Sequence, residues 1–371
     1  MTRAQIPEML LVADPDVLDD AIDEELLDAE DSVEEKLRYE ITSYGADYDV
    51  HGLVRRLKAG DIKIPDFQRG YVWPIKQASR FIESLLLGLP VPGIFLSNEP
   101  ETNKLLVIDG QQRLTTLRQF MDGIWLANKK EFALSDVQES LLGKTYGTLE
   151  EEHRRVLENA IIHATVVKQT DPQDGGSGIY KIFERLNSSG MLLSPQEIRT
   201  AIYGGSLAKL LSKLNENLKW RKLFGPANKR MRDQELILRF LALWRAEDEY
   251  ERPMKSFLNK FMNAHRSPDE TMCQEFEKAF TESVAMAFDV LGEKVFKPVK
   301  AFNAAVFDAV LTGIAKRMAS GPITDYAAFH AAYVSLMADT DFIAETSRST
   351  ANDESVKKRL LKAGNAFQSV P

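Results

Sequence analysis

The amino-acid sequence predicts an α+β protein in which a mixed α/β domain precedes an all-α helical bundle. In the first part, short apolar runs of strand length alternate with segments of helical periodicity. Beyond Ser194 the apolar positions recur almost wholly at helical spacing. A run of acidic residues sets the N-terminus apart. We therefore expect an acidic, weakly ordered arm over residues 1–35, the mixed domain over 36–200 and the helical domain over 201–371.

The acidic arm dominates the charge of the chain. The 371 residues carry a net charge of −8, and residues 1–36 alone contain 13 acids against only two bases. The remaining chain is therefore slightly basic, at +3. A near-neutral body does not fit a protein that coats DNA nonspecifically, which needs a strongly basic face. We interpret the arm as a solvated tail; the alternative is a nucleic-acid mimic or a shield over a basic groove.

The composition favours a reducing compartment. Cys273 is the only cysteine, which excludes an intrachain disulfide framework and a multi-thiolate zinc site. The N-terminus does not have the order of a signal peptide, and the longest apolar stretch, Leu85 to Leu96, is shorter than the ~20 residues that span a bilayer. We expect a cytoplasmic protein with no membrane partner.

Helix and strand signals alternate along the mixed domain. A helix from Glu35 is expected to lead into Ala46–Val50, and Gly60 is expected to end the next helix. The helix that Gly60 ends spans 51–59. The other predicted helices span 74–87, 111–121 and 179–187, and the predicted strands span 94–96, 105–108 and 161–167.

The helical domain begins with a capping signal. Ser194-Pro195-Gln196-Glu197 has the serine at the N-cap, proline at the first helical position and glutamate three residues after the serine. Beyond it, helical periodicity recurs over 206–218, 233–247, 253–264, 270–291, 301–318, 324–338 and 353–366. Apolar helices in the last third could form a homodimer surface.

The segment Asp109-Gly110-Gln111-Gln112-Arg113 is the first candidate site. A strand that turns directly into a helix aims the unpaired N–H groups of the helix at whatever lies above the turn, and these groups favour an anion. Arg113 adds a bidentate phosphate donor, and the two glutamines add neutral donors and acceptors. Asp109 would hold Mg²⁺ or cap the helix. The structural alternative is an ordinary turn, because Asp and Gly are common turn residues.

Two further segments could contribute to the same site. In residues 64–73, Arg69 is either a second phosphate ligand or a surface residue, and Tyr71 and Trp73 either stack on a base or anchor the loop to the core. In residues 183–190, Asn187 either serves the site or caps a helix. The five histidines have no metal-ligand spacing, and P-loop, Rossmann and GxSxG motifs are missing.

Together these segments resemble the N-terminal domain family of GmrSD-type, modification-dependent restriction enzymes, whose core is similar to ParB and sulfiredoxin. The resemblance runs from about residue 50 to 205 and is carried by residues 64–69 with Tyr71 and Trp73, by 107–117, by 183–187 with Gly190, and by 193–198. It implies nucleotide binding and hydrolysis at the DGQQR element, coupled to control of a DNA-cleaving partner in defence against phage.

The resemblance assigns roles to matching positions. The expected catalytic residues are Asp109, Gln112 and Arg113, with Asp109 also holding Mg²⁺. Tyr71 and Trp73 are expected to support the site. The expected nucleotide- and phosphate-binding residues are Gln68, Arg69, Gly110, Gln111, Arg113, Thr115 and Asn187.

This sequence departs from fuller members of the family, which carry a C-terminal His-Asn-His nuclease domain. His330 is its last histidine, so we expect a separately encoded nuclease subunit to cleave DNA. The leading hypothesis is a Mg²⁺-dependent nucleotidase switch that acts as a sensing subunit. The alternative is a non-enzymatic DNA- or partner-binding module in which the same arginines contact DNA phosphates. A ParB-like nuclease comes third.

Overall fold

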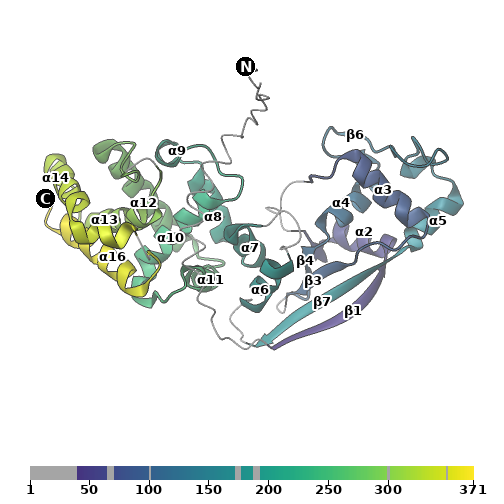
Figure 1. Cartoon of the computed structure of the whole chain (residues 1–371), viewed down its shortest axis with the longest axis horizontal. Coiled ribbons are helices and arrows are strands. Elements are labelled where there is room, and N and C mark those ends of the chain that lie inside the picture. The colour runs from purple at the N-terminus through teal and green to yellow at the C-terminus, as the bar shows by residue number, and fades with distance from the viewer. Residues whose placement is uncertain are drawn as a thin grey trace, which may run out of the picture. The chain divides into compact units, whose positions relative to one another are not determined.

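The computed structural model describes residues 40–64, 71–99, 102–171, 177–186, 193–298, 301–347 and 350–371. The acidic arm and three predicted site residues, Gln68, Arg69 and Asn187, lie outside these ranges. The chain divides into two compact units between Ala208 and Lys209 (Figure 1). The predicted domain boundary near residue 200 lies inside helix α7 (Pro195–Ile202), a few residues before this division.

A five-stranded mixed sheet is the centre of the first unit. Its order is β1-β7-β3-β4-β2, and the strands are β1 (Glu40–Asp49), β7 (Ile161–Asp171), β3 (Ile94–Asn98), β4 (Leu105–Asp109) and β2 (Ile62–Lys63). The β1–β7 and β3–β4 pairs are antiparallel, whereas the β3–β7 and β2–β4 pairs are parallel. A small hairpin of β5 (Ile124–Trp125) and β6 (Lys130–Glu131) follows helix α4 (Gln111–Asp122).

Helices pack on the sheet because its central strands carry buried apolar side chains. Leu96, Val107 and Val166 point into one core cluster, which also contains residues of α2 (Val50–Ala59), α3 (Ile75–Leu86), α4 (Gln111–Asp122) and α5 (Glu151–Asn159). Leu106 and Ile108, which alternate with them on β4, are buried outside that cluster. Helix α6 (Ser177–Leu186) contacts β4 and β7. This arrangement, with the helical unit that follows, is the predicted α+β fold.

The expected helix from Glu35 to Ala46 is wrong over residues 40–45, which belong to strand β1. All ten residues of this strand pair with β7, from Glu40 opposite Asp171 to Asp49 opposite Ile161. Ile41, Thr42 and Tyr44 are residue types that favour strands. The pairing joins segments more than 100 residues apart, which local periodicity could not indicate.

Two predicted helix signals are confirmed. Gly60 ends α2 with a left-handed φ of 74°. Ser194 and Glu197 form the expected capping box: the Glu197 amide donates to Ser194 Oγ at 3.1 Å, and the Ser194 amide donates to Glu197 Oε2 at 2.6 Å.

The second unit is helical in its described residues, as predicted. Predicted and observed bounds agree for most of these helices, but α9 (Leu218–Phe224) and α15 (Thr340–Ser347) were not expected as separate elements. The helices are α8 (Ser206–Asn215), α9 (Leu218–Phe224), α10 (Arg232–Ala246), α11 (Met254–Ala264), α12 (Glu270–Met286) with a π-helical end, α13 (Ala304–Ala319), α14 (Tyr326–Ala338), α15 (Thr340–Ser347) and α16 (Asp353–Gln368).

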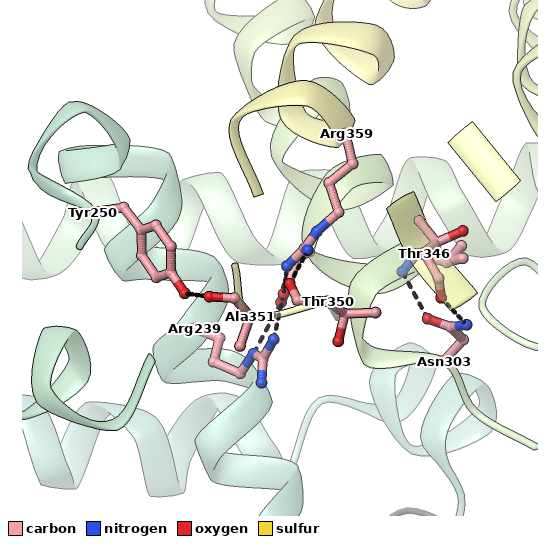
Figure 2. A network of polar contacts seen from close by, with 9 residues as sticks. Arg239, Tyr250, Asn303, Thr346, Thr350, Ala351 and Arg359 are labelled. Carbon is pink, nitrogen blue, oxygen red and sulfur yellow. Dashed lines mark hydrogen bonds and ion pairs between the residues drawn. The ribbon is translucent and has the colours of Figure 1, made fainter. Parts of the chain in front are cut away.

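A buried ion-pair network joins three of these helices (Figure 2). Asp308 on α13 accepts hydrogen bonds from Arg239 on α10, at 3.2 and 2.6 Å, and from Arg359 on α16, at 3.1 Å. The three side chains are at most 5% exposed. Burial alone would lower the pKa of Arg239, but Asp308 raises it above its ordinary value. Burial lowers the pKa of Arg359.

Replacing Asp308→Asn should destabilise the helical unit by about 3–5 kcal/mol, because two buried guanidinium groups would lose their counter-charge. Urea unfolding followed by circular dichroism measures this change. Glu354→Gln is the control, because it removes the same charge from an exposed ion pair. Glu354 pairs with Lys358, and the Glu354 side chain is 74% exposed. It should change stability by less than about 1 kcal/mol. An equal, small effect of the two substitutions would contradict a structural role for Asp308.

Candidate functional site

The turn from β4 into α4 requires a glycine. Gly110 is buried and has a φ of 103°, which L side chains rarely adopt. A Cβ atom at this position would lie 2.4 Å from Cγ2 of Ile94 and 2.8 Å from its Cβ. The turn is therefore pressed against the start of β3, and it directs the axis of α4 away from the end of β4.

The N-terminus of α4 has no side-chain cap from its N-cap residue. That residue is Gly110, and the first backbone hydrogen bond of the helix runs from the Leu114 amide to the Gly110 carbonyl, at 2.9 Å. The amides of the first turn therefore have no acceptor within the helix, and they carry the positive end of its dipole. Asp109 does not cap the helix; its carboxylate pairs with Arg113 instead.

Arg113 is held beside this helix end. Its Nη2 donates to the Gly93 carbonyl at 2.9 Å and to Asp109 Oδ2 at 2.7 Å. The Arg113 side chain is only 15% exposed, whereas that of Asp109 is 53% exposed. Among the described residues the buried Nε of Arg113 has no acceptor. The guanidinium is thus fixed at one nitrogen and keeps donors for an anion.

Gln112 and Thr116 connect α4 to the segment that follows the predicted ligands Gln68 and Arg69. Gln112 Oε1 accepts from the amides of Val72 and Trp73, at 3.1 and 3.3 Å. Thr116 Oγ1 donates to the Gln112 carbonyl and lies 2.7 Å from the Tyr71 hydroxyl. The first two candidate segments of the sequence therefore meet at one helix.

The aromatic rings of Tyr71 and Trp73 pack against other aromatic rings of the same domain. Tyr71 packs edge-on against Trp125, with centroids 5.1 Å apart, and Trp73 packs in the same way against Phe81, at 5.7 Å. Burial raises the pKa of Tyr71 to about 12, and the hydrogen bond with Thr116 opposes this rise. Tyr71 is therefore a neutral hydroxyl at physiological pH. Of the two interpretations of these aromatics, the contacts favour the anchors.

The structure brings together eight of the predicted residues, at the β4–α4 turn and on the segment packed against α4. Gln111 is half-buried at the first position of α4, and Thr115 is buried, at 6% exposure, one residue before Thr116. The eight are Tyr71, Trp73, Asp109, Gly110, Gln111, Gln112, Arg113 and Thr115. Sequence reasoning did not identify Gly93 or Thr116. The spacing of four residues from Gln112 to Thr116 places both on one helix face, which is a signal that could have found Thr116.

The described residues contain no group of three or more His, Cys, Asp or Glu side chains that could hold a metal ion. Asp109 is the carboxylate nearest the α4 N-terminus in sequence. His163 has an acidic partner far away in the sequence: its Nδ1 lies 2.8 Å from Asp47 Oδ1, across the β1–β7 pair. Both of these side chains are exposed.

These features define an α+β domain with an arginine-flanked strand–glycine–helix turn suited to an anion. Residues 50–204 match the family described as the GmrSD restriction endonuclease, N-terminal domain. This part of the chain is therefore similar to the N-terminal domain of a restriction endonuclease, and residues 109–113 lie within the matched range.

A shorter similarity involves an archaeal protein. The chain is 32% identical over 88 residues to the uncharacterized protein MJ0686 of Methanocaldococcus jannaschii. The match covers 18% of this chain and 15% of that protein, so the chain spans a small part of its relative's length. Among the described helices, none is both long and apolar enough to cross a bilayer.

The close approach of Gly110 to Ile94 predicts a large effect of Gly110→Ala. The positive φ costs about 1–2 kcal/mol, and the steric overlap should add about 1–3 kcal/mol. Gly123→Ala at the other end of α4 is the matched control, because Gly123 has a φ of 74° and nothing within 4 Å of an added Cβ. Thermal unfolding measures both. Equal losses of stability would mean that the turn is not pressed against β3.

Proposed function

We propose that this domain binds a nucleoside triphosphate at the α4 N-terminus and hydrolyses it slowly with Mg²⁺, as the sensing subunit of a prokaryotic anti-phage restriction-type system. The observation that supports the proposal best is the position of Arg113. Its guanidinium is mostly buried beside a helix N-terminus without a side-chain cap, and both of its hydrogen bonds to described residues use Nη2. Both features favour a phosphate at this place.

The electrostatics of the turn suit phosphoryl transfer. Catalysis of this reaction depends mainly on positioning and on stabilisation of the negative charge that spreads over the phosphoryl oxygens. The first-turn amides of α4 and the guanidinium of Arg113 would both face that charge. The bond from Arg113 to the Gly93 carbonyl holds the guanidinium in place before substrate arrives, which reduces the cost of ordering it on binding.

Asp109 is the residue proposed to hold Mg²⁺, directly or through water. Magnesium is usually bound by one or two carboxylates together with the phosphates of the substrate, so a single exposed carboxylate at the turn fits this use. The ion would neutralise part of the phosphate charge when bound. Asp109 would also keep its ion pair with Arg113, which orients both side chains toward the same ligand.

Gln112 is proposed to act from the same first turn of α4. Its Oε1 is used by the amides of Val72 and Trp73, so its NH₂ group is the part that could orient a phosphate oxygen. The same bonds hold the segment after Gln68 and Arg69 near α4. We propose that Gln68 and Arg69, with Gln111, Thr115 and Asn187, complete the nucleotide site.

DNA and a separately encoded nuclease subunit are the partners proposed for this subunit. The family description names a restriction endonuclease, whose substrate class is DNA. Nucleotide turnover would then control a partner nuclease.

The test is phosphate release from each of the four NTPs with Mg²⁺. Arg113→Ala should reduce the release at least about 100-fold, as expected for the loss of one charge-stabilising donor. Arg118→Ala is the control: Arg118 lies on the same helix, is also intermediate in exposure, and is outside the turn. It should keep near wild-type release.

Both variants are compared at temperatures that give them equal folded fractions. Release that depends on Arg113 and not on Arg118 would support the nucleotidase and identify its substrate. If the wild-type protein releases no phosphate from any NTP, with or without DNA, the enzymatic proposal fails. The non-enzymatic binding module then becomes the better account.

A further inference from the structure

The helical unit contains a concentrated basic segment, which we define as residues 217–232. It covers α9 and the loop that leads to α10, and it contains six bases and no acid in a chain whose net charge is −8. The bases are Lys219, Arg221, Lys222, Lys229, Arg230 and Arg232. The near-neutral average of the chain body therefore hides a local concentration of basic residues.

A buried tryptophan fastens this segment to the core. Trp220 of α9 is fully buried, and its ring lies 5.3 Å from that of Phe307 and 5.8 Å from that of Phe280. Its Nε1 donates to Asn215 Oδ1 at 3.0 Å. Since Trp220 faces inward, its neighbour Lys222 lies exposed on the other side of α9. The cations are thus presented by a fixed element.

A buried carboxylate fixes the loop after α9. Asp233 has no exposed area and accepts from Arg221 Nη1 at 2.8 Å, from Asn215 Nδ2 at 2.9 Å and from the Asn228 amide at 3.0 Å. These bonds hold the chain on both sides of Gly225 and Pro226. They also neutralise Arg221.

Two lysines of the segment are not neutralised. Lys219 pairs with Asp289 at 2.5 Å, but Lys222 and Lys229 are exposed and form no ion pair with any described residue. Lys222 lies over the ring of Phe288, 5.2 Å from its centroid, which restricts its position without removing its charge. Two exposed cations are therefore held on either side of a fixed turn.

We propose that the basic segment binds the phosphate backbone of duplex DNA, at a surface separate from the nucleotide site. Lysine and arginine side chains on a fixed surface are the groups that contact backbone phosphates. Trp220 is buried, and the ring of Phe224 packs on that of Phe302, 5.4 Å away, so neither provides a platform on which unpaired bases could stack. Duplex DNA read through its backbone fits this surface better than a single strand, and binding should be independent of sequence.

The test measures binding of the full chain to a fluorescent duplex of about 30 base pairs at salt concentrations between about 50 and 200 mM. The double variant Lys222→Glu/Lys229→Glu should bind at least about tenfold more weakly. It should also lower the salt slope by about 2, roughly one for each phosphate that the lysines no longer neutralise. The control, Lys260→Glu/Lys357→Glu, makes the same charge change at exposed lysines of α11 and α16. It should keep most of the affinity.

Thermal unfolding first establishes that the variants are folded, and Lys222→Gln/Lys229→Gln replaces the charge reversal if that variant does not fold. Equal losses of affinity in the two double variants, or an unchanged salt slope at 222 and 229, would overturn the proposal. So would binding of the wild type to anionic phospholipid vesicles but not to the duplex. Phosphate release from NTP by the 222/229 variant should be unchanged, so failure here is distinct from failure of the nucleotidase proposal.

Discussion

The candidate site depends on the close approach of Gly110 to Ile94. The β3–β4 ladder brings the end of one strand beside the start of the other, and the chain must then leave the sheet at once to begin α4. Only a residue without Cβ fits between them. The same approach places the Gly93 carbonyl, one residue before Ile94, within reach of Arg113. One steric constraint thus sets the direction of the helix dipole and the position of the guanidinium.

A second set of interactions links α4 to residues 71–73, about 40 positions earlier in the chain. Gln112 and Thr116 hold Tyr71, Val72 and Trp73, and the two aromatic rings then pack into the core. Gln112, Tyr71 and Trp73, which the sequence indicates as candidate site residues, therefore also stabilise the fold. A loss of activity on changing Gln112 or Tyr71 would not by itself assign either residue to catalysis, whereas Arg113 stands beside the helix end with donors still available.

The sequence predicted those elements whose stabilising contacts join residues that are close together in the chain. Strand β4, the turn at Gly110, the glycine end of α2 and the capping box at Ser194 all follow from residues within a few positions of each other. Strand β1 did not follow, because its ten residues are held by β7 across more than 100 positions. The Asp308 network was likewise invisible, since its arginines lie 69 and 51 residues away. For the site, sequence placed Arg113 correctly on the first turn of a helix, but the Gly93 acceptor arises from the sheet register.

The most direct measurement of the central claim is hydrogen exchange of the α4 amides with and without a non-hydrolysable NTP analogue and Mg²⁺. The first-turn amides have no acceptor within the helix, so a bound phosphate should slow exchange at residues 111–113 while the helical unit exchanges at its unliganded rate. Unchanged exchange at 111–113 under saturating nucleotide, or protection confined to another region, would contradict a phosphate site at this turn.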